Sequence, residues 1–117
     1  MTRLYHGTSS KNADLIKKNG LSLEFSGTNW GTTYGKAIYF TPNYSEAKLY
    51  AQNFNEDGIV LTFDFNNLKT LQLSRDYSPS DKKDKKQISS LINYLKLTSE
   101  INCLINVHKN EYILFKL

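Results

Sequence analysis

The chain has 117 residues, of which 39% are hydrophobic and 13% aromatic, and its formal net charge is +4. This length fits one domain over residues 1–117 with a core of its own, and the aromatic content excludes a disordered chain. Cys103 is the single cysteine, which excludes an internal disulfide and a four-thiolate metal site. The sequence has no apolar run of membrane-spanning length and no apolar secretory signal at its start. We therefore expect a monomer of the reducing cytoplasm with no membrane partner.

The first third of the chain predicts a short strand, a capped helix and a loop. The strand is expected at residues 3–6. Ser9 or Ser10 can cap the helix that follows, and Asn19-Gly20 supplies a residue that tolerates the positive φ typical of a helix end. Residues 26–35 contain three glycines and the single tryptophan and show no regular period, which indicates a loop.

A strand and a helix are predicted next. The run at residues 36–41 is of β type, and Thr41 is expected to cap a helix whose first residue is Pro42, because proline suits the first helical position. Apolar residues recur at helical spacing along this segment, so one face of the helix should pack inward. They are Ala47, Tyr50, Ala51 and Phe54.

The second half of the chain predicts most of the strands and one more helix. The helix should be capped by Ser80 or Asp81, and its apolar face is formed by Ile88, Leu91, Ile92 and Leu95. Strands are expected at residues 59–65, 70–73, 102–107 and 111–117. The whole pattern is that of an α+β fold.

Three polar residues lie on or beside apolar strands. His6 ends the first predicted strand, Tyr39 lies within the second, and Glu111 begins the last. Each has an ordinary explanation when taken alone, as a surface histidine, a core tyrosine and an exposed edge carboxylate. Their neighbours in the sequence make a stronger case for chemistry.

Five blocks that contain these residues run in order along the chain. They are His6-Gly7-Thr8, Leu15-Ile16 with Gly20-Leu21, Gly35-Lys36-Ala37-Ile38-Tyr39-Phe40, Tyr50, and Asn110-Glu111-Tyr112-Ile113-Leu114-Phe115. Their order and spacing resemble the motifs of the poly(ADP-ribose) polymerase and diphtheria-toxin-like branch of ADP-ribosyltransferases, the branch named for its His, Tyr and Glu. The blocks span residues 4 to 115, nearly the whole chain.

The resemblance implies a fold and a reaction. The fold would be ADP-ribosyltransferase-like, with two packed, mainly antiparallel β-sheets and flanking short helices. The reaction would use NAD as donor, without a metal, and transfer ADP-ribose to a protein or nucleic-acid acceptor. We expect transfer of a single unit, because little chain remains to hold a second one.

The resemblance also implies roles for individual residues. The catalytic residues would be Glu111, His6 and Tyr39. Glu111 would stabilise the positive charge that develops on the ribose as nicotinamide leaves. Tyr39 and Tyr50 would stack on the nicotinamide ring, Gly7 would present its peptide group to the carboxamide, and His6 would bind the adenosine ribose. The donor-binding residues implied are His6, Gly7, Thr8, Tyr39, Tyr50, Ser45, Trp30 and Tyr34.

The sequence departs from the family pattern in two places. Ala47 stands where members often have a serine that bonds the carboxamide, and Ser45 is the nearest hydroxyl, two residues earlier. Ser22 stands where some members have a basic residue. Residues 24–35 occupy the place of the loop that covers the donor, so Trp30 or Tyr34 would lie over NAD.

Other functions stay open. Water could be the acceptor, which would make the protein an NAD glycohydrolase. The net charge, the Lys82–Lys86 tract and the pair His6 and His108 are also compatible with a small RNA-binding protein or ribonuclease. A nucleotide-binding module without turnover is a further alternative. An RNA 2′-phosphotransferase is disfavoured, because Arg3 and Arg75 are the only arginines.

Overall fold

The computed structural model describes residues 1–23, 36–54, 57–78 and 80–117. Within these residues it contains the mixed α+β architecture that the sequence predicts. The elements in chain order are β1 (Thr2–Ser9), α1 (Ser10–Asn19), β2 (Ile38–Phe40), α2 (Tyr44–Gln52), β3 (Gly58–Phe65), β4 (Thr70–Gln72), α3 (Lys82–Thr98), β5 (Cys103–Asn106), the 3₁₀ turn η4 (Val107–Lys109) and β6 (Glu111–Leu114).

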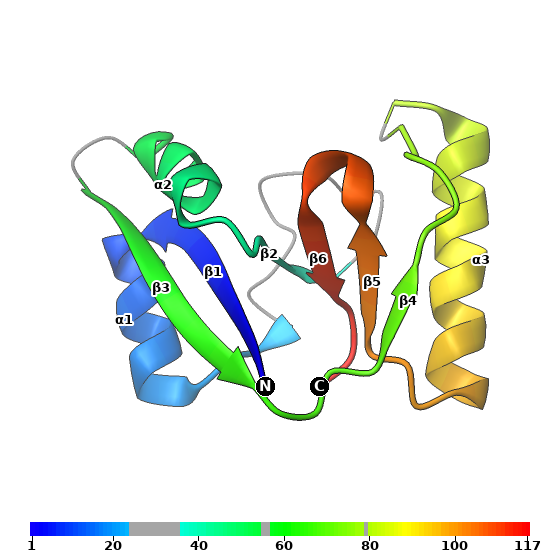
Figure 1. The fold of residues 1–117 in the computed structure, drawn as a ribbon, viewed down its shortest axis with the longest axis horizontal. Helices are drawn as coiled ribbons and strands as arrows, with labels where there is room; N and C mark the ends of the chain where they lie inside the picture. Colours follow the sequence, from blue (N-terminus) through cyan, green and yellow to red (C-terminus); the bar gives the residue numbers. More distant parts are fainter. Residues whose placement is uncertain (24–35, 55–56, 79) are drawn as a thin grey trace.

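The strands form two sheets (Figure 1). β1 and β3 pair antiparallel along their whole length, whereas the second sheet has the order β2-β6-β5-β4, with only the β4–β5 pair parallel. The sheets meet where Tyr5 of β1 and Thr41 pair: each peptide N–H donates to the other residue's carbonyl, at 2.8 and 2.9 Å. α1 and α2 flank β1 and β3, and α3 runs beside the four-stranded sheet (Figure 1).

Two apolar clusters fill the molecule, one on each face of the four-stranded sheet. Side chains of successive strand residues point to opposite faces, so the pair Leu104–Ile113 belongs to one cluster and the pair Cys103–Leu114 to the other. The first cluster includes the buried face of α3, formed by Ile88, Ile92 and Leu95. The second joins the sheet to β1 and β3 through Leu4, Phe40, Phe63 and Phe65.

The structure confirms one of the two predicted caps for each of the first and last helices, Ser9 and Asp81, and the predicted stop of the first helix at Gly20. The Ser9 hydroxyl accepts the N–H of Asn12 at 3.2 Å, and Gly20 ends α1 with a φ of +78°. At the start of α3, the Asp81 carboxylate accepts the N–H groups of Lys83 and Asp84. Short polar side chains therefore fix both helix starts by binding peptide groups that have no partner within the helix.

The predicted start of α2 is wrong by two residues. The cap is Asn43, whose side-chain oxygen accepts the N–H groups of Ser45 and Glu46, and Pro42 precedes the cap instead of opening the helix. Thr41 cannot lead directly into a helix because its peptide groups pair with Tyr5 in extended geometry. Its hydroxyl instead accepts the N–H of Asn43, which turns the chain toward α2.

α2 lies unusually close to β1 and β3, because two glycines face it. A Cβ built on Gly7 would fall 2.8 Å from the backbone nitrogen of Ala51 and closer still to the carbonyl oxygen of Ala47. A Cβ built on Gly58 would likewise clash with backbone atoms of Ala51. The absence of side chains at these two strand positions therefore sets the height of α2 above the sheet.

None of the helices described here is both long and apolar enough to cross a membrane.

Candidate active site

The side chain of His6 is held by the backbone of β2. Its Nδ1 lies 2.7 Å from the carbonyl oxygen of Tyr39, and because a carbonyl only accepts, Nδ1 carries the proton and Nε2 is the acceptor. Burial lowers the pKa of His6, and the hydrogen bond to Tyr39 opposes this only in part. His6 is therefore a neutral imidazole at neutral pH, with one nitrogen fixed and the other able to accept a hydroxyl proton.

Tyr39 and Glu111 lie on one face of the four-stranded sheet. The register pairs Tyr39 with Ile113, two residues after Glu111, and residues two apart on a strand point to the same side. Such diagonal neighbours on adjacent strands have backbones roughly 7–8 Å apart, which is within reach of an aromatic side chain. Extending the register by one residue places Thr41 directly opposite Glu111. The structure thus brings together the tyrosine and the glutamate that the sequence motifs contain.

Glu111 is a partly buried carboxyl group with charges nearby. Burial raises its pKa, Lys109 on the preceding turn lowers it, and Asp76 raises it. Asp76 is itself held by the amide of Asn106, the cross-strand partner of Glu111, at 2.8 Å. A carboxylate that has lost part of its hydration interacts strongly with any positive charge that forms beside it.

Gly7 offers its peptide group outside the β1–β3 ladder. Successive residues of a strand direct their N–H and C=O groups to opposite edges, and Tyr5 directs both of its groups to Thr41. Gly7, two residues later, directs its own groups to that same edge, away from β3. The peptide of Gly7 is thus available at the edge of the two-stranded sheet, next to the point where the two sheets join.

Tyr50 completes the group from α2. Its side chain is 54% exposed, and its pKa is raised by partial burial and then by the negative charges of Glu111 and Glu46. Tyr50 therefore lies within electrostatic range of both carboxylates. His6 is thus bonded to the backbone of Tyr39, Tyr39 shares a sheet face with Glu111, and the charge of Glu111 acts on Tyr50.

The remaining residues of the predicted set take different positions. Thr8 is buried on β1, on the face that carries His6. Ala47 is completely buried against Gly7, whereas Ser45 is exposed near the start of α2, and helix residues two apart do not share a face. Trp30 and Tyr34 lie outside the described residues, so their predicted place over NAD stays a prediction.

The sequence did not indicate the contacts that Glu46 makes in this region. The carboxylate of Glu46 accepts a hydrogen bond from the Asn110 side chain at 3.1 Å and another from the Thr41 hydroxyl at 3.2 Å. Asn110 has a left-handed backbone, with φ 48° and ψ 46°. An asparagine just before a strand is a weak sequence signal for such a conformation, and nothing in the sequence indicates its contact with α2.

The side chains that could ligate a metal do not gather at any one place in the described part of the chain. No group of three or more His, Cys, Asp and Glu residues there could hold a metal ion. The expectation of a reaction without a metal stays a prediction.

Comparison with known families identifies the family of the chain. The sequence model of the poly(ADP-ribose) polymerase catalytic domain matches residues 1–113. The chain belongs to this family. It is an ADP-ribosyltransferase of the poly(ADP-ribose) polymerase type, and such domains use NAD as substrate. Neither a curated protein nor a solved structure matches the chain significantly.

Proposed function

We propose that this poly(ADP-ribose) polymerase-type domain transfers a single ADP-ribose from NAD to a protein or nucleic-acid acceptor, with Glu111 as the catalytic carboxylate. The observation that carries the proposal is the convergence of Glu111 and Tyr39 on one sheet face, with His6 bonded to the backbone of Tyr39. These residues are up to more than a hundred positions apart in the chain. Packing of the fold alone does not require a histidine, a tyrosine and a glutamate at these three positions.

The donor would be held by groups that need little reorganisation. Tyr39 and Tyr50 would enclose the nicotinamide ring, since aromatic faces favour a planar pyridinium. The N–H and C=O of Gly7 would bind the carboxamide, a role supported by their direction away from β3. The neutral His6 would accept a ribose hydroxyl at Nε2, which positions the donor and moves no proton in the reaction.

The chemistry follows from the charge on the departing ring. When the bond between the ribose and nicotinamide breaks, its electron pair neutralises the pyridinium nitrogen and positive charge develops on the ribose. Glu111 would stabilise that charge and orient the ribose hydroxyl beside it. The acceptor's nucleophilic atom would then form a bond to the ribose carbon and release its proton to solvent. Partial burial strengthens the effect of the carboxylate, because a poorly hydrated charge is less screened.

Single transfer is supported by the small size of the region next to Glu111. β5 and β6 are joined by the three residues of η4 and by Asn110, which leaves little protein surface to grip a previously attached ADP-ribose. Labelled NAD with candidate acceptors, read by mass, separates one added unit from several.

The decisive experiment is nicotinamide release from NAD by the purified chain beside Glu111→Gln. Gln keeps the shape of the side chain and removes its charge, so release should fall by about 10²-fold or more. His108→Ala, on the exposed turn, serves as the control and should release nicotinamide at the wild-type rate. No nicotinamide release from the wild type, together with RNA cleavage that His108→Ala abolishes and Glu111→Gln retains, would instead favour a ribonuclease. Release that is complete without any acceptor, and produces free ADP-ribose only, would favour an NAD glycohydrolase.

A further inference from the structure

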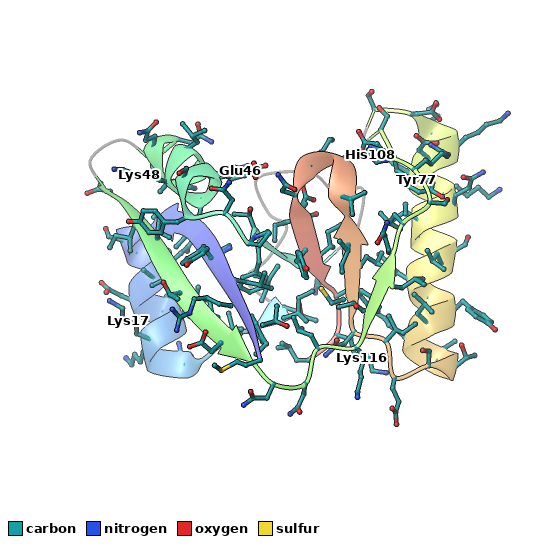
Figure 2. All side chains as sticks on the ribbon, in the orientation of Figure 1. Lys17, Glu46, Lys48, Tyr77, His108 and Lys116 are labelled. Atoms are coloured by element: carbon teal, nitrogen blue, oxygen red, sulfur yellow. The ribbon has the colours of Figure 1, made fainter. Side chains whose placement is uncertain are left out.

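Glu46 links the two residues that flank Glu111. One carboxylate oxygen accepts from the side chain of Asn110, which precedes Glu111 in the chain, and the other accepts from the hydroxyl of Thr41. Thr41 lies opposite Glu111 when the β2–β6 register is extended. Figure 2 shows Glu46 on the side of α2 that faces β6. A single carboxylate therefore spans both neighbours of the catalytic residue.

The hydrogen bond from Asn110 to Glu46 lies at the residue where the backbone changes direction before β6. Asn110 is the only non-glycine residue with positive φ in the described part of the chain, and it turns the chain from η4 into β6. Its own N–H reaches the carbonyl of Val107 only at 3.5 Å, which is a weak hydrogen bond. The bond from its amide to the charged Glu46 is of the stronger, charge-assisted kind. Glu46 thus adds a charge-assisted bond to a turn that is also held by the Asn106 side chain and the Lys109–Asp76 ion pair.

The position of Glu111 depends on that turn. Among the described residues, no side chain is hydrogen-bonded to the Glu111 carboxylate. The main chain of Glu111 pairs with Asn106 of β5 and directly follows Asn110, so the turn at Asn110 affects where the carboxylate lies. The position of Glu46 is itself held by two contacts. The side chain of Asn43 accepts the N–H of Glu46 at 3.4 Å, and α2 packs directly against Gly7.

We propose that Glu46 is a positioning residue that fixes Glu111 for catalysis through Asn110 and Thr41. The inference rests on the proposed role of Glu111 and adds a specific cause for its geometry. A helix-end role alone is the competing explanation, since a carboxylate in the first turn of a helix is also stabilised by the helix dipole. The two explanations differ in what they predict for turnover.

The test compares Glu46→Ala, Glu46→Gln and Asn110→Gly, which retains the positive φ and removes the amide. Glu46→Ala and Asn110→Gly should each lower kcat for nicotinamide release roughly tenfold and leave KM for NAD within about twofold, because small displacements of a catalytic group cost rate more than donor binding. The double variant should be no worse than either single one, since both remove the same bond. Glu46→Gln should recover most of the rate, because its amide oxygen can still accept from Asn110.

Lys48→Ala is the matched control, because Figure 2 shows Lys48 on the opposite side of α2 and its side chain is exposed. It should have wild-type kcat. Amide hydrogen exchange at residues 110–112 provides a readout that needs no NAD, and it should accelerate in Glu46→Ala and not in Lys48→Ala. Unchanged exchange in Glu46→Ala, or additive losses in the double variant, would overturn the positioning role. Faster exchange with no nicotinamide release from the wild type would show that Glu46 stabilises the turn before β6, but would refute the proposed function and with it the catalytic part of this role.

Discussion

The close seating of α2 on β1 can be tested by adding one methyl group. In Gly7→Ala the new Cβ would meet backbone atoms of Ala47 and Ala51, the nearer of which is the Ala47 carbonyl oxygen. Backbone atoms of a helix cannot rotate away as a side-chain end can, so the whole of α2 must move outward. Overpacking of this kind costs typically about 1–3 kcal/mol, and we expect a value near 3 kcal/mol because no flexible group can give way.

At this chain length such a loss should lower Tm by roughly 10–15 °C, which differential scanning calorimetry can measure without NAD. Gly7→Ala combined with Ala47→Gly should be no more stable, because the clash is with the Ala47 carbonyl and not with its methyl group. Gly20→Ala separates steric from conformational effects: nothing lies near its Cβ, but its φ of +78° is strained for alanine. It should lose about 1–3 kcal/mol yet retain nicotinamide release. An unchanged Tm for Gly7→Ala would refute the packing argument.

Three further outcomes are expected from the charges, the helix caps and the burial of single groups. Glu111→Gln should raise Tm at neutral pH, because a carboxyl group whose pKa is raised on folding destabilises the fold when it is ionised. The gain in Tm should vanish as the pH falls below the ordinary pKa of glutamate. A lower Tm of the variant at neutral pH would contradict this. Asp81→Ala should cost about 1 kcal/mol by removing the cap of α3, whereas Asp81→Asn should not; equal Tm values for the two would contradict the capping role. Burial raises the pKa of Cys103 to about 12, so a thiol reagent at pH 8 should label the unfolded chain and not the folded one; fast labelling of the native protein would show that β5 opens readily.

Local signals in the sequence were sufficient for most of the secondary structure. The caps Ser9 and Asp81 and the stop at Gly20 act within one turn of the residues they control. The sequence could therefore give the stop and narrow each cap to two adjacent residues without a fold. The start of α2 was missed because Thr41 and Asn43 are both good caps. The choice between them depends on the pairing of Thr41 with Tyr5, a contact between distant segments.

The features of the candidate site also fall into those with a local sequence signal and those that depend on contacts between distant segments. His6, Tyr39 and Glu111 could be singled out because they lie in motifs, and motifs are local. The link from Glu46 to Asn110 joins residues 64 positions apart, and a glutamate in the first turn of a helix is too ordinary to attract notice. Gly7 was assigned to donor binding alone, whereas its packing against α2 could be found only once the helix and strand were placed.

The place of β6 in the sheet has a consequence for synthesis of the protein. β6 comes after every other described strand in the chain, yet it lies between β2 and β5 and carries Glu111 at its start. During synthesis on the ribosome, β2 can therefore pair with β6 only after nearly all of the preceding chain has emerged. Pairings between segments so distant in sequence form slowly. The carboxylate arrives with the strand that closes the sheet. With the proposed role of Glu111, a chain that lacks β6 would have neither a complete four-stranded sheet nor the carboxylate that NAD cleavage requires.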